Sequence, residues 1–343
     1  MNVRASSLRL AAAVLAVGLL AGPATAQPVP GEPMFPALAA GPEGATQIVV
    51  EGPRYALTLN RVDGGWVAEN HGDFPVRSAP VDAILASLGA MVAHDVVTEN
   101  PVEYGALDVQ GPGEGTEDIH VRLADANGNA LVDAIVGAPA AIRDPDPLSG
   151  IYVRNVDDAA AWFVVGGFGI PARLSAWFDP LLQIPGPTVT SISILRGETL
   201  LMQADKVDPA TGLYGLIAIA EEIGPMDRAI LDIDALRGLT QAVVSVNAED
   251  VVARDAVTVP AEPRIVRITT QTGLVLTLTV VEGTGGAWVT IDAEAAAPEA
   301  TATADEINAR TVNWAFQLPE FNTMTLSKEI TELVIITAPA SFF

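Results

Sequence analysis

The feature that most constrains the fold of this chain is a pattern of short elements that occurs three times. Each occurrence has two short apolar strands, a turn marked by glycine or charge, a third strand and an amphipathic helix. The clearest two begin at Gln47 and Arg264, and a fainter one begins at Ser191. Because a repeated sequence pattern is usually a repeated folding unit, we expect three copies of one strand-strand-strand-helix unit.

The first copy shows the expected elements most clearly. Alternating apolar residues predict strands over 47–51 and 55–61, and Asp63-Gly64-Gly65 predicts a turn into a strand that starts at Trp66. Apolar residues at helical spacing from Val81 to Val92 predict a helix with Ser78 as its N-cap. In the later copies we expect helices over 226–239 and 304–316, and closing strands over 242–246 and 333–336.

These elements predict an α+β protein with mainly antiparallel sheets and helices packed on one face. Pro185-Gly186-Pro187 is the strongest internal boundary, so we expect one domain over 46–187 and a second region over 188–343. Residues 98–187 have no counterpart in the other copies and are expected to form an insertion. Within this insertion, Asn127-Gly128 predicts a hairpin turn between strands over 119–123 and 130–136.

The N-terminal sequence predicts export from the cytoplasm. Residues 1–26 combine Arg4 and Arg9, an apolar run of 12 residues, and small residues before Gln27. This pattern is typical of a signal peptide, with an uncleaved membrane anchor as the alternative. Residues 27–45 are rich in proline and predict a linker. The chain has no cysteine, which excludes disulfides and thiolate metal sites. We therefore expect a periplasmic or exported protein, either free or tethered by its N-terminus.

The charge balance limits the classes of partner. The chain has 42 acidic and 18 basic residues, a formal net charge of −24, and Lys206 and Lys328 are its two lysines. Nucleic acids and anionic lipid surfaces need clustered positive charge. We expect no nucleic-acid partner, and membrane contact only through the N-terminus or through another protein.

Two motifs resemble ligand-binding loops but lack essential parts. Gly167 to Ala172 match the G-x-G-x-x-A dinucleotide pattern, yet Pro171 lies within it and no βαβ unit follows. Asp125, Asn127, Asn129 and Asp133 have oxygen ligands suited to calcium, but the glycine is at the fourth position and Val136 occupies the last. We interpret the first motif as a glycine-rich turn and the second as a hairpin tip.

The remaining candidates for chemistry do not form a recognisable pattern. His71, His94 and His120 lack metal-binding spacing, and they fall in a turn, at a helix end and in a strand. The acid pairs Glu221-Glu222 and Asp232/Asp234 would serve glycoside hydrolysis only if they faced each other across a cleft. We predict no catalytic residue, no cofactor and no metal ligand.

The five tryptophans are better explained by packing than by ligand binding. Trp66 and Trp288 occupy equivalent places in two copies, as do Trp177 and Trp314, each of which precedes a Leu-Pro or Ile-Pro pair. Recurrence at one structural position indicates core packing, whereas a sugar-stacking platform would need exposure on one face. Trp162 is the fifth.

The order and spacing of these elements resemble a known family. The elements are the Leu59–Val67 run, Asp73-Phe74-Pro75, the helix over 81–92, Glu103-Tyr104-Gly105, and Trp177-Phe178 followed by Ile184-Pro185. Together they are similar to the exported bacterial family called domain of unknown function 4340, over about residues 30–195, with degenerate copies beyond. The resemblance implies an auxiliary component of ABC transporters of the gliding-motility kind that faces the periplasm. It carries over no catalytic residue.

We therefore expect a non-enzymatic periplasmic accessory or scaffold protein that binds a protein partner or an exported polymer beside an ABC transporter. The alternative is an extracytoplasmic carbohydrate-binding protein or hydrolase whose site is assembled only in three dimensions. Clustered carboxylates in a concave site would favour the alternative. An exposed apolar patch or an open sheet edge would favour partner binding.

Overall fold

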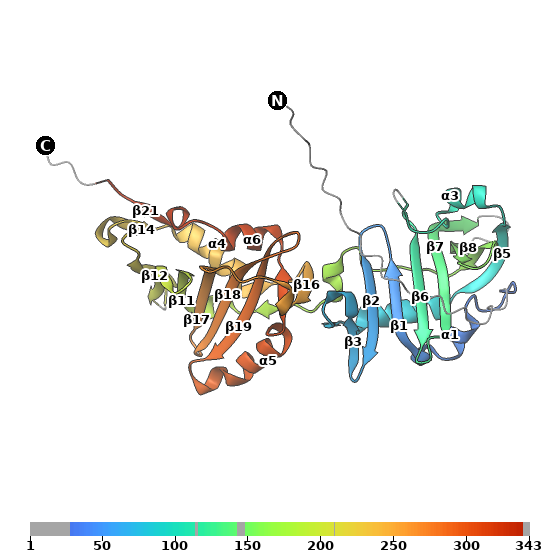
Figure 1. The fold of residues 1–343 in the computed structure, drawn as a ribbon, viewed down its shortest axis with the longest axis horizontal. Helices are drawn as coiled ribbons and strands as arrows, with labels where there is room; N and C mark the ends of the chain where they lie inside the picture. Colours follow the sequence, from blue (N-terminus) through green and yellow to red (C-terminus); the bar gives the residue numbers. More distant parts are fainter. Residues whose placement is uncertain (1–27, 114–115, 143–147, 209, 339–343) are drawn as a thin grey trace, which may run out of the picture.

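A computed structural model describes residues 28–113, 116–142, 148–208 and 210–338 (Figure 1). The predicted signal peptide or anchor, residues 1–26, lies outside these ranges. Strands take 44% of the structure and helices, most of them short, take 26%. The α+β class was therefore wrong, because antiparallel sheets dominate the fold and few helices accompany them.

The first large sheet has nine strands in the order β4-β3-β2-β1-β6-β7-β8-β9-β5. Every neighbouring pair is antiparallel, and β2 follows β1 through a turn at Gly52. The strands are β1 (Ala45–Glu51), β2 (Ala56–Val62), β3 (Gly65–Ala68), β4 (Phe74–Val76), β5 (Val92–Thr98), β6 (Ile119–Asp125), β7 (Ala130–Ile142), β8 (Leu148–Asn155) and β9 (Ala161–Val165).

The second large sheet has eight strands in the order β13-β12-β11-β17-β18-β19-β20-β16, also antiparallel. Two short ribbons, β10 with β15 and β14 with β21, accompany it. The strands are β10 (Leu182–Gln183), β11 (Val189–Arg196), β12 (Thr199–Asp208), β13 (Leu213–Ile219), β14 (Ala229–Leu231), β15 (Ser245–Val246), β16 (Asp250–Ala253), β17 (Arg264–Thr270), β18 (Leu274–Gly283), β19 (Gly286–Ala295), β20 (Trp314–Gln317) and β21 (Val334–Ile336).

Apart from β4, which has no counterpart in the second sheet, both sheets have the same topology, so the repeat is twofold and larger than the pattern in the sequence predicted. In each sheet two three-stranded meanders join through their first strands, β1 with β6 and β11 with β17. After the first meander the chain forms a helix and then one strand, β5 or β16, which lies at the edge of the sheet. This strand pairs with the sheet strand that comes last along the chain, β5 with β9 and β16 with β20. The residues expected to be a unique insertion, 98–187, contain β6 to β9, which correspond to β17 to β20.

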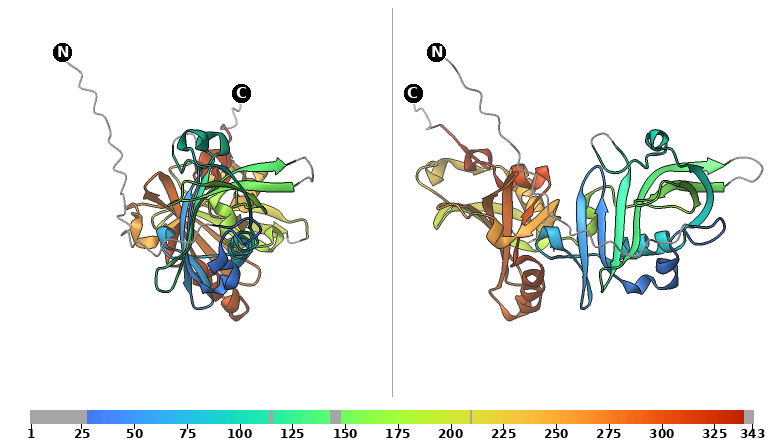
Figure 2. Two further views of the ribbon diagram at one scale, coloured as in Figure 1. Left: turned by 90° about the vertical axis from the view of Figure 1, so that its right-hand side faces the viewer. Right: turned by 45° about the vertical axis from the view of Figure 1, so that its right-hand side comes forward.

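We call the first sheet with its helices the N-terminal unit and the second the C-terminal unit. Their strands occupy 45–165 and 189–317, on either side of the expected boundary at 185–187. The division into domains over 46–187 and 188–343 stays a prediction. Figure 1 and the right-hand view of Figure 2 show the two units side by side along the longest axis of the molecule.

The helices differ from their predicted bounds in ways that the flanking residues explain. Helix α2 (Ser78–Gly89) begins at Ser78, and its N-cap is Arg77, which makes no side-chain cap. Helix α4 (Ile233–Val244) begins after Asp232, whose carboxylate accepts the backbone N–H groups of Asp234 and Ala235. That cap explains why Met226 to Leu231, expected to be helical, instead form a 3₁₀ turn and β14.

Two further predictions about the helices were wrong. Residues 242–244, expected in a closing strand, are the last turn of α4, and only β15 follows. Helix α5 (Thr301–Thr311) ends before Trp314, which lies in β20, so the helix expected over 304–316 is too long. The sequence analysis missed α6 (Glu320–Leu326) and α3 (Tyr104–Leu107).

The core extends into the segment that was expected to be a linker. Helix α1 (Pro36–Ala40) contributes Leu38, which is fully buried, and the preceding Met34 and Phe35 are also buried. The backbone of Met34 donates to the carbonyl of Met91, so this segment also runs beside the start of β5. Residues 31–40 are therefore part of the N-terminal unit, because their apolar side chains complete its core.

Candidate binding surface

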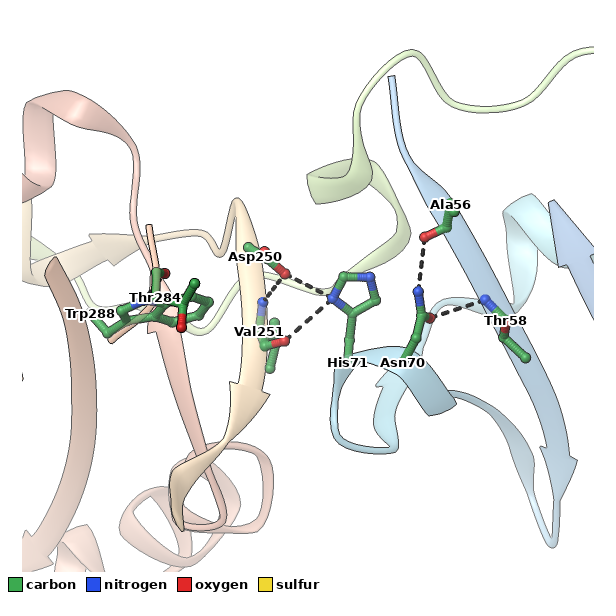
Figure 3. A network of polar contacts seen from close by, with 8 residues as sticks. All are labelled: Ala56, Thr58, Asn70, His71, Asp250, Val251, Thr284 and Trp288. Carbon is green, nitrogen blue, oxygen red and sulfur yellow. Dashed lines mark hydrogen bonds and ion pairs between the residues drawn. The ribbon is translucent and has the colours of Figure 1, made fainter. Parts of the chain in front are cut away.

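The junction between the two units brings together the most site-like cluster of side chains. His71 lies in a short 3₁₀ helix (Glu69–His71) of the N-terminal unit, and Asp250 begins β16 of the C-terminal unit (Figure 3). The Nδ1 atom of His71 lies 2.8 Å from Oδ1 of Asp250 and 3.3 Å from the carbonyl oxygen of Val251. Because both partners are acceptors, Nδ1 carries the proton.

An aromatic cluster continues this junction. The buried ring of Phe74 makes edge contacts with Phe178, Trp314 and Phe316, at centroid distances of 5.2, 5.1 and 5.7 Å. The indole N–H of Trp314 donates to the carbonyl oxygen of Gly72 at 2.7 Å. Edge-to-face aromatic pairs and a partly buried hydrogen bond both favour one fixed arrangement. The cluster therefore joins the units.

The chemistry of His71 also points to a structural role. A catalytic histidine paired with aspartate uses its second nitrogen to reach a nucleophile or a water. Here Nε2 is buried without a hydrogen-bond partner in the described part of the chain, and the ring edge lies against Phe178. The His71–Asp250 pair therefore contributes a contact between units, which the position of His71 in a predicted turn did not indicate.

The other two histidines lie on the N-terminal sheet. His120 in β6 contacts Asp133 of β7 through Nε2 at 2.7 Å and Glu51 of β1 through Nδ1 at 3.2 Å. The hydrogen bond to Asp133, with help from Glu51, raises the pKa of His120. His94, expected at a helix end, lies in β5 beside Asp95. No group of three histidine or acidic side chains suited to a metal occurs among the described residues.

The loop with calcium-like spacing is a hairpin tip. The carboxylate of Asp125 accepts the backbone N–H groups of Asn127 and Asn129 and the side-chain amide of Asn129. These hydrogen bonds, the side chain of Asn129 first, lower the pKa of Asp125. Gly128 has φ +81° and no atom lies near its missing Cβ, as a tight hairpin requires. Asp133 points elsewhere, to His120.

The G-x-G-x-x-A match also has a structural explanation. Residues 167–172 follow β9 without a long helix, and residues 169–172 form one wall of an open cleft of about 230 Å³ beside Tyr55. The hydroxyl of Tyr55 donates to the carbonyl oxygen of Pro171 at 2.6 Å and accepts from the buried indole of Trp177 at 2.9 Å. Burial raises the pKa of Tyr55. The motif therefore anchors a loop and lacks the helix N-terminus that a dinucleotide needs.

The acid pairs do not face each other across a cleft. Glu221 and Glu222 lie in the turn after β13 and are exposed. Asp232 caps α4, and Asp234 pairs with Arg237 one turn later.

The tryptophans pack as expected, with one exception. Trp66, Trp162, Trp177 and Trp288 are buried, and Trp66 and Trp288 each lie in the third strand of a meander. Trp177 and Trp314, however, are not equivalent, because Trp177 lies in a 3₁₀ turn and Trp314 in a strand at the junction.

The open edge of β13 is the strongest candidate for a binding surface. This strand pairs with β12 on one side and makes no backbone hydrogen bond on the other within the described chain. Its seven residues, Leu-Tyr-Gly-Leu-Ile-Ala-Ile, include no charge and no proline. Natural edge strands are usually protected by lysine, proline, short length or a covering element. In the N-terminal unit the equivalent strand, β3, is covered by β4.

Exposed apolar side chains surround this edge. Leu213 and Ile217 of β13 are 51% and 47% exposed. The neighbouring strand β14 pairs with β21, so that Ile230 and Ile335 lie opposite each other and are 54% and 55% exposed. Figure 1 places β12, β14 and β21 at the end of the molecule farthest from the N-terminal unit. Sequence reasoning missed this surface because it predicted 226–239 as one amphipathic helix.

The fold and this surface define a class: a mainly antiparallel β protein built from two like units, with an open, apolar sheet edge at one end. A family model described as Domain of unknown function (DUF4340) matches residues 66–263. The chain belongs to this family, which confirms the resemblance seen in its sequence.

Comparison with curated proteins gave no match, and comparison with solved structures gave none. Within the described residues no helix is long and apolar enough to cross a membrane.

Proposed function

We propose that this chain is a non-enzymatic accessory protein that binds a polypeptide partner at the open edge of β13. The observation that carries the proposal is the uncharged, proline-free edge strand with Leu213 and Ile217 exposed on it. An exposed strand of this kind presents unpaired N–H and C=O groups that another chain can use. A surface of this chemistry favours partner binding over enzymatic activity.

The partner adds an extended segment to the sheet. In this mode, backbone hydrogen bonds supply affinity and alternate side chains supply specificity. Leu213 and Ile217 would contact apolar side chains of the incoming strand, and the pair Ile230–Ile335 would extend the contact. Because the chain carries a formal charge of −24, a segment of low negative charge associates best.

The location and the wider assembly are also part of the proposal. Export to the periplasm is supported by the sequence of residues 1–26, and placement beside an ABC transporter by the family resemblance. The alternative is a carbohydrate-binding protein or hydrolase, and the candidate residues for it have structural roles. His71 lies at the junction, Asp125 holds the hairpin turn, and Asp232 caps α4.

Site-specific photo-crosslinking in cells tests the proposal. A benzoylphenylalanine placed at Leu213 should give one defined protein adduct, and the same group at Val102 should not. Val102 is a matched control, because it is 89% exposed and lies in the N-terminal unit, far from this edge. The substitution Ile217→Lys places a charge on the edge strand. Combined with benzoylphenylalanine at Leu213, it should abolish the adduct without changing the melting temperature of the protein.

The proposal fails if Leu213 gives no adduct, or if Ile217→Lys leaves the adduct unchanged. Identification of the adduct by mass spectrometry then shows whether the partner is an envelope protein or a transporter subunit. A cytoplasmic partner would contradict the proposed location while leaving the binding edge intact.

A further inference from the structure

A second feature of the C-terminal unit is a pocket between α4 and the turn that joins β12 to β13. We call it the α4 pocket. Its volume is about 500 Å³, within the range of sites that hold small organic ligands. It is lined by Gly186, Pro187, Lys206, Ala210, Thr211, Gly212, Tyr214, Ile233, Leu236, Arg237, Thr240 and Gln241.

The charge of this lining is opposite to that of the whole chain. Lys206 and Arg237 line the pocket, and none of its lining residues is acidic. In a chain with 42 acidic and 18 basic residues, this is a local reversal of sign. A cavity with walls of one sign concentrates ligands of the opposite sign. The pocket therefore favours an anion.

Lys206 is held in the wall without an ionic partner. Its ammonium group donates to the carbonyl oxygen of Pro187 and lies 5.7 Å from the centre of the Tyr214 ring. No carboxylate within the described residues forms a salt bridge with it. Since an ammonium group has three donors, two remain for a ligand.

The neighbouring carboxylates are already engaged. Asp208 accepts the backbone N–H groups of Ala210 and Thr211 and the hydroxyl of Thr211, which shapes the turn beside the pocket. Those bonds, the hydroxyl of Thr211 first, lower the pKa of Asp208. Asp234 pairs with Arg237 on the exposed face of α4. Both side chains of that pair are largely exposed, so the pairing is weak and Arg237 can be shared with a ligand.

Thr211, Thr240 and Gln241 add polar groups to the lining, and several of its other residues are apolar. Leu236 is almost fully buried at the pocket wall, and Ile233, Pro187 and the ring of Tyr214 add to it. The hydroxyl of Tyr214 donates to the carbonyl oxygen of Val189 at 2.7 Å, so a ligand in the pocket would contact the ring of Tyr214 and not its hydroxyl. A ligand that fits both parts of the lining has an anionic group and an apolar body.

We infer that the α4 pocket binds a carboxylate attached to an apolar body, with Lys206 as the main cationic contact and Arg237 as the second. Two sources share this chemistry: a free organic acid and the C-terminal carboxylate of a polypeptide. The inference goes beyond the proposed function, because it rests on a different set of residues and needs no partner bound at β13.

Isotopic labelling of lysine at Cε tests the inference directly. The full chain should give two lysine signals, one from Lys206 and one from Lys328, assigned by Lys206→Met and Lys328→Met. Titration with benzoate should shift the Lys206 signal alone, and benzamide, which lacks the charge, should not shift it. Lys206→Met should weaken benzoate binding, measured by isothermal titration calorimetry, by about tenfold or more, since a charge-assisted hydrogen bond is lost.

Further measurements serve as controls and distinguish a free organic acid from a polypeptide C-terminus as the ligand. Lys328→Met should bind benzoate like the unchanged chain, because Lys328 follows α6 and does not line the pocket. An acetylated Val-Ile-Phe peptide with a free C-terminus, compared with its amide, decides between a polypeptide terminus and a free acid. Equal binding of benzoate and benzamide, a shift of both lysine signals, or no binding of either acid at 10 mM would overturn the inference. None of these results bears on the photo-crosslink at Leu213.

Discussion

The junction between the units makes a quantitative prediction about Gly72. This residue has φ +68°, and a Cβ added to it would lie 2.7 Å from the backbone nitrogen of Ala253 in the other unit. Ordinary contacts begin at 3.4 Å, so Gly72→Ala must move the two backbones apart by about 0.7 Å. That movement weakens the hydrogen bond from Trp314 to Gly72, worth about 1 kcal/mol, and loosens the contacts of Phe74, worth about 0.5–1.5 kcal/mol each.

Gly128→Ala is the matched control. Gly128 also has a left-handed backbone, φ +81°, but nothing lies within 4 Å of the position of its Cβ. Both substitutions carry the backbone strain, about 1–2 kcal/mol, partly offset by the smaller entropy of the unfolded chain. The difference between them isolates the junction, and we expect Gly72→Ala to lower the free energy of unfolding by about 1–3 kcal/mol more than Gly128→Ala.

Equilibrium urea unfolding measures this difference. Far-UV circular dichroism reports both units, and tryptophan fluorescence includes Trp314 at the junction. In Gly72→Ala we also expect the fluorescence change to begin at a lower urea concentration than the change in circular dichroism, because the junction opens first. Equal losses of stability in the two variants, with coincident transitions, would refute the view that this junction holds the units together.

Three further predictions concern single contacts. The raised pKa of His120 means that the native state binds its proton more tightly, so the stabilisation by Asp133 is complete below the unfolded pKa near 6.5. It is lost as the pH rises through the higher folded pKa, and His120→Gln should abolish this pH dependence in urea melts. Asp232→Ala should cost about 1 kcal/mol by removing the cap of α4, measured by thermal unfolding. Trp314→Phe should cost about 0.5–1.5 kcal/mol through the lost bond to Gly72, measured by urea unfolding.

Local sequence patterns predicted the strands of this protein well. The first-copy strands and turn at Asp63–Gly65, the hairpin tip at Gly128 and the late strand near 334 all occur close to where alternation and turn residues placed them. Such elements depend on neighbours in the sequence, which alternation and glycine directly report. The fold class was wrong because the same apolar residues at 226–231 and 314–317 fit either a helix or a strand, and long-range pairing with β21 and β16 decided the outcome.

The repeat shows the same limit. A meander is a local feature, so the sequence displayed similar meanders but not how they pair through β1 with β6 and β11 with β17. The candidate surface depends on that pairing too. Whether the edge of β13 is covered is decided by β14, which pairs with β21 about a hundred residues later in the chain. The α4 pocket likewise needs Pro187, Lys206 and Arg237 to meet.

The pairing of β5 with β9 determines when the N-terminal sheet can form during synthesis of the chain. As the polypeptide is made from its N-terminus, β5 has no strand beside it within the sheet until residues 161–165 follow. The N-terminal unit can then close and Phe178 can pack against Phe74, but the side of Phe74 that contacts Trp314 and Phe316 stays uncovered until those two residues have been made. For nearly half of its synthesis the growing chain thus exposes an aromatic face that the finished molecule buries. Chaperone dependence should therefore be greatest for chains that stop between residues 165 and 314.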